Sequence, residues 1–391
     1  MRILHITNFF KPSFEAGGVV NVAYNLSKKL VEKGHEVVVY TTNRCSTDIG
    51  VETNKPIYVD GIKVYYFENL RKYFNNIQPL PYYLPLIAKK NIQHFDVIHI
   101  HEHRTFLAVF VHYYAKKHGI PYVLHAHGSA PRIIEQKRLK YLFDIFFGYK
   151  ILRDASKVIA VSNVEVDQYQ EMGVSKEKIV VIPNGIDVDS FNDLPEKGIF
   201  RKKYGISEKY IVLFFGRLHE RKGIDFLIKS YAELRKELDD VVLVLAGSDS
   251  GYKTKAETLI NDLNLTNEVR FIGYVDDADK LAAYVDADVL VYPSIFEIFG
   301  LVPFEAIMCG TPVIVTDDCG CGDLIKEAKC GYLVKYGDVN YLEERMKWVI
   351  KNPNEREKLV EFGRNYIKDN LTWNHVIRKM EEIYESCIRY V

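Results

Sequence analysis

The sequence has no excess of positive or negative charge. Lysine and arginine together number 52, and so do aspartate and glutamate. A chain without a basic field lacks the long-range attraction that draws a polyanion to a protein surface. We therefore expect no nucleic-acid partner, and any anion site must be a local concentration of positive side chains.

Long apolar runs are also missing. No stretch approaches the ~18 apolar residues of a membrane-spanning helix, and the opening MRILHITNFF alternates apolar and polar side chains. That alternation favours a first strand over a signal peptide. The six cysteines form no CxxC pair, and the close spacing of Cys319 and Cys321 is too little to indicate a metal site. We expect a cytoplasmic protein with reduced thiols.

The GxGxxG fingerprint of dinucleotide-binding proteins is absent as well, which removes the main support for a nicotinamide enzyme. The chain does contain a regular alternation of β-branched runs and amphipathic segments. At 391 residues it is too long for one ordinary core, so we expect two domains of about 190 residues each.

The predicted strands fall into two sets. They are residues 2–7, 36–42, 96–101, 121–125, 157–161 and 180–182, then 210–215, 241–246, 269–274, 289–292 and 312–316. Alternation with helices predicts an α/β protein with two doubly wound parallel sheets. We place the N-terminal domain at 1–195, the C-terminal domain at 196–370, and at 371–391 a helix that packs back on the N-terminal domain. Ligands of such sheets bind beside the carboxyl ends of strands, so we expect the active site between the domains.

The segment Val289 to Thr316 predicts a strand, a polar loop, a short helix and another strand. Pro303 is tolerated only in the first turn of a helix, so the helix begins near Gly300 or Leu301. Glu305 then lies in its early turns. The free N–H groups of such a helix start favour an anion, commonly a phosphate.

Two basic side chains follow the strand at 210–215. Arg217 and Lys222 lie in the loop GRLHERKG, which has a glycine at each end. Arginine binds phosphate through a planar fork and lysine binds it as a point charge. The competing interpretation is a solvated basic turn. The preceding buried strand favours phosphate binding, because it brings the loop to the ligand-binding edge of the sheet.

Earlier in the chain, Gly17 and Gly18 lie between the first strand and the first helix. Without side chains, they let a ligand approach the backbone at a helix start.

Four motifs together resemble the retaining family 4 glycosyltransferases in residue type, spacing and order. They are the loop GRLHERKG, the E-x7-E pair Glu297 and Glu305, PNGID at 183–187, and the Gly17-Gly18 loop. The resemblance covers nearly the whole chain. It implies the GT-B fold, in which two Rossmann-like domains face each other across a cleft and the C-terminal domain holds a nucleotide sugar.

The resemblance also implies roles for individual residues. Arg217 and Lys222 hold the diphosphate, Glu305 accepts hydrogen bonds from the ribose, and Glu297 contacts the transferred sugar. The remaining positions are Phe299, Gly300 and Leu301, which supply helix-end amides, Gly17 and Gly18, which face the phosphates or the acceptor, and His127, which meets the sugar. The resemblance further implies that the departing phosphate oxygen takes the acceptor's proton, so that no protein nucleophile is required. We expect no metal or other cofactor. The family's Gly-Gly-x-x-Glu is replaced here by residues 319–323, CGCGD.

Other functions stay open on the sequence. His99, His101 and His103 alternate and therefore share one face of a strand end, which is a metal-ligand spacing and suggests a metal-dependent hydrolase. A sugar-nucleotide epimerase of the same fold and a non-catalytic sugar-nucleotide-binding subunit are further alternatives. We favour a retaining, metal-independent hexosyltransferase that uses a UDP- or GDP-sugar and a glycan or glycolipid acceptor.

The segments 71–90 and 132–153 mix basic residues with leucine, isoleucine, phenylalanine and tyrosine. A basic amphipathic face suits a membrane surface that carries a lipid-linked acceptor. Ordinary core helices with lysines outside are the alternative. We therefore add peripheral contact with the inner face of the membrane as a hypothesis.

Overall fold

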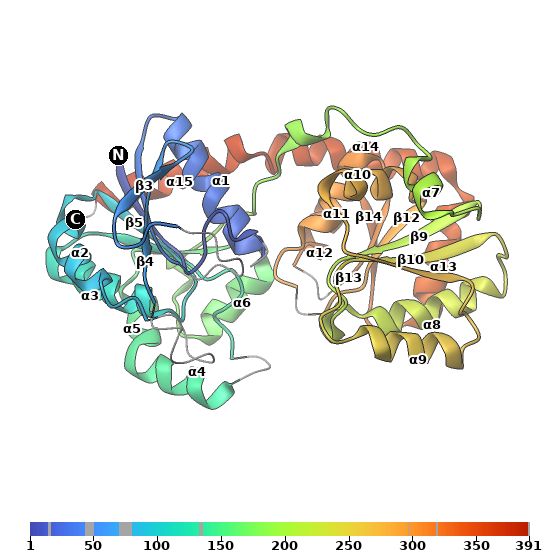
Figure 1. The fold of residues 1–391 in the computed structure, drawn as a ribbon, viewed down its shortest axis with the longest axis horizontal. Helices are drawn as coiled ribbons and strands as arrows, with labels where there is room; N and C mark the ends of the chain where they lie inside the picture. Colours follow the sequence, from blue (N-terminus) through green and yellow to red (C-terminus); the bar gives the residue numbers. More distant parts are fainter. Residues whose placement is uncertain are drawn as a thin grey trace. The chain divides into compact units, whose positions relative to one another are not determined.

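The computed structural model describes residues 1–14, 17–43, 51–69, 80–132, 136–295, 297–317 and 320–389. The chain forms two compact units (Figure 1). Unit 1 comprises Met1–Gly185 together with Trp373–Val391, and unit 2 comprises Ile186–Thr372. Unit 2 is therefore inserted in the sequence of unit 1.

Unit 1 is built on an eight-stranded sheet in the order β3-β4-β2-β1-β5-β6-β7-β8. The strands are β1 (Arg2–Ile6), β2 (Glu36–Thr42), β3 (Pro56–Val59), β4 (Ile62–Phe67), β5 (Val97–His101), β6 (Tyr122–His125), β7 (Lys157–Ala160) and β8 (Ile179–Val181). All neighbours pair in parallel except β3 and β4. The central strands are buried on both faces, which explains their nearly continuous apolar sequences.

The hairpin of β3 and β4 was not among the predicted strands. Its turn is Asp60-Gly61, and both residues have positive φ angles of 50° and 81°. Such angles are those of the tight turns that match the twist of a hairpin, and Asp-Gly is a typical sequence for them. The hairpin gives an otherwise parallel sheet one antiparallel edge.

Helices cover both faces of this sheet (Figure 1). One face packs against α1 (Gly18–Glu32) and α15 (Trp373–Arg389), with Ile3 and Val97 pointing into that layer. The opposite face packs against α2 (Leu84–Asn91), α3 (Phe106–His118), α5 (Tyr149–Asp154) and α6 (Asn163–Glu171). A further helix, α4 (Lys137–Phe143), contributes no buried residue.

Unit 2 contains a fully parallel six-stranded sheet in the order β11-β10-β9-β12-β13-β14. The strands are β9 (Tyr210–Phe215), β10 (Val241–Ala246), β11 (Val269–Gly273), β12 (Val289–Tyr292), β13 (Val313–Thr316) and β14 (Gly331–Val334). One face packs against α8 (Ile224–Arg235), α9 (Lys253–Asp262) and α13 (Val339–Lys351). The other helices are α7 (Ile199–Tyr204), α10 (Asp277–Asp286), α11 (Leu301–Cys309), α12 (Gly322–Ala328) and α14 (Pro353–Asn370). The predicted class, two doubly wound α/β domains, is confirmed.

Each sheet reverses its strand order at one point. In unit 1 the reversal lies between β1 and β5, and in unit 2 it lies between β9 and β12. The loops that follow such a pair of strands diverge to opposite faces and leave a crevice for a ligand. The glycine loop at 17–18 follows β1, GRLHERKG follows β9, and Glu297 follows β12.

The two segments that join the units are held together by backbone contacts. Ile186 donates its N–H to the carbonyl of Leu371 at 2.7 Å, and Ile186 and Thr372 form a parallel bridge. Gly185 lies against the indole of Trp373, where a Cβ on the glycine would overlap three ring carbons. Glycine is therefore required at 185 by packing.

We expect Gly185→Ala to lower the free energy of unfolding of unit 1 by about 1–3 kcal/mol, because the added methyl displaces a buried ring. The chain has two tryptophans, so Trp373 fluorescence in a Trp348→Phe background reports this unit during urea unfolding. Gly18→Ala is the matched control, since its Cβ would meet no atom within 4 Å. Equal midpoints for the two variants would contradict the packing argument.

Candidate functional site

The carboxyl edge of the unit 2 sheet is formed by two loops that touch each other. The loop after β9 ends in a 3-10 turn at Glu220–Lys222, and the loop after β12 runs from Pro293 to Gly300. Ile295 donates its N–H to the carbonyl of Arg221 at 2.8 Å. A Cβ on Gly223, whose φ is 63°, would overlap the carbonyl oxygen of Pro293. The glycine thus lets the two backbones approach at the switch point of the sheet.

Lys222 and Glu297 form an ion pair across these loops. The Tyr292 hydroxyl lies 2.9 Å from both the Lys222 ammonium and the Glu297 carboxylate, and the ammonium lies 4.9 Å from the centre of the tyrosine ring. Burial raises the pKa of Glu297, but the charge and hydrogen bond of Lys222, with further help from Tyr292 and Arg221, outweigh burial and lower it. Glu297 is therefore ionised at neutral pH. It is a weak base and well suited to accept hydrogen bonds.

Arg217 lies on the same loop but apart from this pair. The loop backbone is fixed, because Gly216 donates to Ala246 at 2.9 Å and Leu218 donates to Ser248 at 2.8 Å. The Arg217 side chain is exposed, and it has no hydrogen bond or ion pair with another part of the described chain. The structure thus joins the predicted residues Lys222 and Glu297 directly and leaves the Arg217 guanidinium available to a ligand.

The helix after Glu297 begins where the position of Pro303 led us to expect it. α11 starts at Leu301, and Gly300 precedes it with a φ of 75°. The Phe299 ring is buried and stacks on Phe304, with ring centres 5.4 Å apart, so this residue faces the edge only through its backbone. The amides of the first turn lie beside the Lys222 and Glu297 loops, since a Cβ on Gly300 would approach Glu297 Cγ at 3.3 Å.

Glu305 lies one turn further along α11. Its carboxylate accepts a hydrogen bond from the Tyr284 hydroxyl at 3.1 Å and pairs with Lys280 at 3.5 Å. The side chain keeps 21% of its surface exposed. Glu305 is therefore oriented by two neighbours and still accessible.

The loop before α12 forms a third wall, which sequence reasoning left without a role. Gly320 donates its N–H to the carbonyl of Glu297 at 2.6 Å, and a Cβ on Gly320 would overlap the carbonyl oxygen of Ile298. Cys319 lies outside the described residues, whereas the Cys321 side chain is buried. The glycine in the CGCGD sequence was the available signal for this backbone contact.

In unit 1 the predicted glycines lie at the amino end of α1. Gly17 has a φ of 111° and precedes the helix, which begins at Gly18. No atom lies within 4 Å of a Cβ built on either glycine, so both backbones border open space. The preceding residues 15 and 16 lie outside the described part of the chain.

His127 follows β6 in a left-handed backbone conformation, with a φ of 51°. Such a conformation is strained for a residue with a side chain and is common at functional sites. The neighbouring Gly128 donates its N–H to Glu165 Oε1 at 2.6 Å, and Val161 donates to Glu165 Oε2 at 2.9 Å. Burial raises the pKa of Glu165 to about 7, against the opposing effect of these hydrogen bonds. Sequence reasoning missed Glu165, which holds the His127 turn in place.

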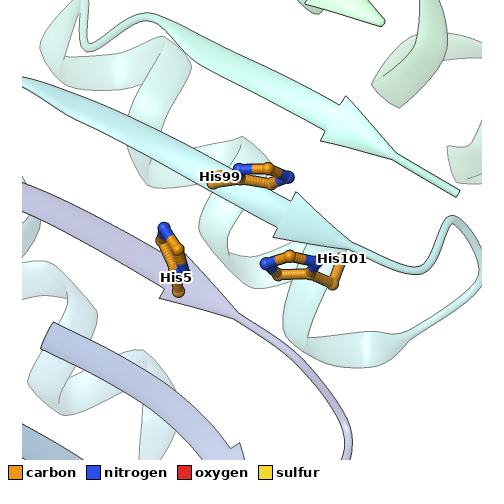
Figure 2. A group of neighbouring side chains, drawn as sticks. All are labelled: His5, His99 and His101. Carbon is orange, nitrogen blue, oxygen red and sulfur yellow. The ribbon is translucent and has the colours of Figure 1, made fainter. Parts of the chain in front are cut away.

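Four histidine rings stack at this turn, His127 among them, and a fifth, His5, meets two of them at angles of 58° and 63°. His5 and His99 are paired neighbours on β1 and β5, and His101 is paired with His125 on β6. Ring centres are 4.2 Å apart for His99 and His101, 5.3 Å for His101 and His127, and 3.6 Å for His125 and His127. We call this set, His5, His99, His101, His125 and His127, the histidine column. Figure 2 shows His5, His99 and His101.

The expectation that His99, His101 and His103 share one face is wrong for His103. β5 ends at His101, and Glu102 has a φ of 71°, which breaks the strand alternation. His103 Nε2 lies 3.1 Å from the carbonyl oxygen of Gly148, away from the column. The proposed hydrolase triad is therefore not assembled in this form.

A separate basic and apolar surface extends over α4 and the π-helical turn at Asp144–Gly148 that follows it. Leu139 is 63% exposed, Leu142 50% and Phe146 60%. A recess of about 520 Å³ lies between this segment and α3, and its lining includes Tyr113, Phe146, Phe147, Lys116, Lys117 and Lys150. Residues 71–79 and 133–135 of the two predicted amphipathic segments lie outside the described residues. Among the described helices, none combines the length and apolar character needed to cross a bilayer.

Comparisons with known proteins agree with this architecture. The curated relatives include an uncharacterized glycosyltransferase of Methanocaldococcus jannaschii, 25% identical over 98% of both chains. A phosphatidyl-myo-inositol mannosyltransferase of Mycobacterium leprae is 32% identical over 53% of each chain. Among solved structures, the HepE protein of Anabaena in complex with UDP superposes with a TM-score of 0.80 at 21% identity, covering 99% of this chain and 100% of HepE.

Two family models match the chain one after the other. Residues 16–190 match the model described as Glycosyltransferase Family 4, and residues 196–366 match the one described as Glycosyl transferases group 1. Together the two matches span both units. The chain therefore belongs to the family 4, or group 1, glycosyltransferases and has their GT-B fold.

Proposed function

We propose that this glycosyltransferase is a retaining enzyme that transfers a hexose from a UDP- or GDP-sugar to a glycan or glycolipid. The observation that carries the proposal is the arrangement of Lys222, Glu297 and the start of α11 at the switch point of the unit 2 sheet. A cation, an oriented carboxylate and free helix amides suit a ligand with a diphosphate and a polyhydroxyl group. The complex of HepE with UDP gives the nucleotide diphosphate a precedent in the same fold.

In this proposal each residue has a distinct role. Lys222 and Arg217 bind the diphosphate, and the amides of Phe299, Gly300 and Leu301 add hydrogen bonds to it. Glu305 accepts hydrogen bonds from the ribose, and Glu297 accepts them from the transferred sugar. His127 also contacts the sugar, while the Gly17 and Gly18 backbones face the phosphates or the acceptor.

The transfer itself breaks the bond between the anomeric carbon and the phosphate oxygen and forms a bond to the acceptor oxygen on the same face of the sugar. The acceptor's proton passes to the departing phosphate oxygen, so charges and atoms balance without a protein nucleophile. Glu297 is a poor nucleophile because Lys222 lowers its pKa and holds its carboxylate. Negative charge grows on the diphosphate as the bond breaks, and Lys222, Arg217 and the helix start stabilise that charge without a metal ion.

We propose further that the acceptor is lipid-linked and that the α4 surface rests on the membrane. Lys137 and Arg138 of α4 are exposed, Lys140 is half-buried, and the leucines and tyrosine of the helix are half exposed or more. Apolar side chains among lysines are the pattern of an interfacial helix on an anionic lipid surface. The relative from Mycobacterium leprae, whose name specifies a phosphatidyl-inositol acceptor, is consistent with this choice.

The donor is tested by thermal unfolding of the whole chain with UDP, GDP, ADP and their sugar derivatives, each with and without EDTA. A ligand at 100 times its Kd adds about 2.7 kcal/mol to the free energy of unfolding. We expect UDP or GDP to stabilise the protein in EDTA, and Glu305→Gln to weaken that effect because the amide accepts ribose hydrogen bonds less well. No shift with any nucleotide would overturn the donor assignment. Release of an altered sugar nucleotide without any acceptor would indicate an epimerase instead.

Removal of one phosphate-binding cation tests the catalytic roles. We expect Arg217→Ala or Lys222→Ala to lower kcat/KM roughly 100-fold, which corresponds to a loss of about 3 kcal/mol of transition-state stabilisation. The circular dichroism spectrum should be unchanged. Lys229→Ala is the control, because Lys229 lies on α8 and pairs only weakly with Asp225 at 3.8 Å. Activity within threefold of the wild type in both variants would refute the phosphate roles.

Vesicle sedimentation tests the membrane surface. The double variant Leu139→Glu with Leu142→Glu should lose binding to anionic vesicles at low salt, since it removes apolar contacts and adds like charge. Phe362→Glu on α14 is the control, because Phe362 is 53% exposed but lies in unit 2. Absence of wild-type binding, or equal binding by both variants, would remove the membrane from the proposal and leave the donor assignment untouched.

A further inference from the structure

The inner part of the histidine column has polar atoms that no protein group satisfies. His99 Nε2 and His101 Nε2 are fully buried and have no hydrogen-bond partner. Each such atom costs about 1–3 kcal/mol when it is left without a partner, so its presence in a core calls for an explanation, and a bound ion is one. The third ring, His5, is equally buried.

In each of the three rings the Nδ1 atom lies within hydrogen-bonding distance of a polar group. His5 Nδ1 lies 2.9 Å from Ser27 Oγ, His99 Nδ1 lies 2.6 Å from the Tyr384 hydroxyl, and His101 Nδ1 lies 3.0 Å from His127 Nε2. Histidines that bind a metal commonly donate the other ring N–H to such a partner, which fixes the ring and its tautomer. Of the three Nε2 atoms, those of His99 and His101 have no hydrogen-bond partner among the described residues.

The Ser27 contact assigns the tautomer of His5. The Ser27 hydroxyl donates its proton to the carbonyl of Ala23 at 2.7 Å, so its oxygen accepts from His5 Nδ1–H. His5 Nε2 then carries the lone pair, and its nearest hydrogen-bonding group is the Tyr384 hydroxyl at 3.5 Å. Burial lowers the pKa of His5 to about 3 and lowers that of His99 and His101 as well. The rings are therefore neutral, as metal ligands must be.

We propose that His5, His99 and His101 bind one first-row transition-metal ion of the kind that imidazole prefers, with Zn²⁺ as the first candidate. One ligand atom from each of the three residues lies within 4.8 Å of the other two. Figure 2 shows the three rings beside the neighbouring strands β1 and β5 that carry them. Ser27, Tyr384 and His127 are the outer partners that orient the ligands.

Binding requires a small rearrangement of the rings. His99 and His101 stack with an angle of 7° between their planes, and one ion cannot lie in both planes at once. Rotation about the bond from Cβ to the ring is soft for histidine, so the rings can tilt toward a shared ion. The competing group, His101, His125 and His127, is less suitable. Both nitrogens of His125 lack partners, so no outer group orients that ring.

The ion we propose is structural and lies outside the transfer chemistry. It would join β1 to β5 and, through Tyr384, fix α15 on unit 1. None of the described carboxylates forms a hydrogen bond with His5, His99 or His101. The positive charge of the ion would therefore remain uncompensated in an apolar layer, which is costly. Because a lower charge reduces this cost, the singly charged Cu⁺ is the second candidate.

The test uses the full chain, stripped with a chelator and then dialysed separately against Zn²⁺, Co²⁺ and Cu⁺ under reducing conditions. We expect about one equivalent of bound metal by mass spectrometry and a rise of several degrees in the unfolding temperature. With Co²⁺, the visible absorption of a nitrogen-ligated tetrahedral ion should appear, a readout that needs no variant. Less than a tenth of an equivalent with all three ions would overturn the proposal.

Variants then locate the site. His99→Gln and His101→Gln should each lower the affinity at least tenfold, whereas His103→Gln should keep it. His103 is the matched control, because it is buried and close in sequence but bonded to Gly148. Near-ultraviolet circular dichroism confirms that each variant is folded. Full retention of the metal in the His99 and His101 variants, or equal loss in the His103 variant, would assign the ion to another place.

Discussion

Close contact between backbones at the carboxyl edge of the unit 2 sheet is the constraint on which the proposed donor site depends. Gly223 lies against the carbonyl of Pro293, and Gly320 lies against the carbonyl of Ile298. A side chain at either position would push the loops apart. Because the loops touch, Lys222 meets Glu297 and Tyr292 with little exposed surface, and water weakens their interaction less than at a free surface. The ion pair between Lys222 and Glu297 thus depends on the absence of a side chain at Gly223 and at Gly320.

Unit 1 stabilises its buried polar groups in two different ways. Arg104 and Asp144 remain charged, joined by two hydrogen bonds of 2.8 Å, and Arg104 also donates to the carbonyl of Ala130. This paired geometry compensates the loss of hydration and fixes the base of the exposed α4 surface. The histidine column has no such counter-charge, and its rings are held neutral by burial. The two solutions lie in different places. His5 and His99 contact Ser27 of α1 and Tyr384 of α15, whereas Arg104 precedes α3 and Asp144 begins the π-helical turn after α4.

The features that could be predicted from the sequence are those with local causes. Apolar runs located the parallel strands except β4 and β14. Pro303 located the start of α11, and the order of β9 and β12 brought Lys222 and Glu297 to one edge. The histidine column required the register of β1 against β5, which no local pattern specifies. Tyr384 reaches His99 from the far end of the chain, and Glu165 acts on the His127 turn through backbone N–H groups. Such long-range partners leave no spacing in the sequence to recognise.

The insertion of unit 2 within unit 1 also sets an order of events during synthesis. All the strands and helices of unit 2 are made before residue 373, so this unit can fold while the chain is still attached to the ribosome. Unit 1 is made first but completed last, because α15 supplies Trp373, Ile377, Met380 and Tyr384 to its core. Until that helix emerges, the apolar and histidine-bearing face of the first sheet has α1 but lacks the other half of its helical cover. The nascent chain thus keeps part of the unit 1 core exposed throughout the synthesis of unit 2.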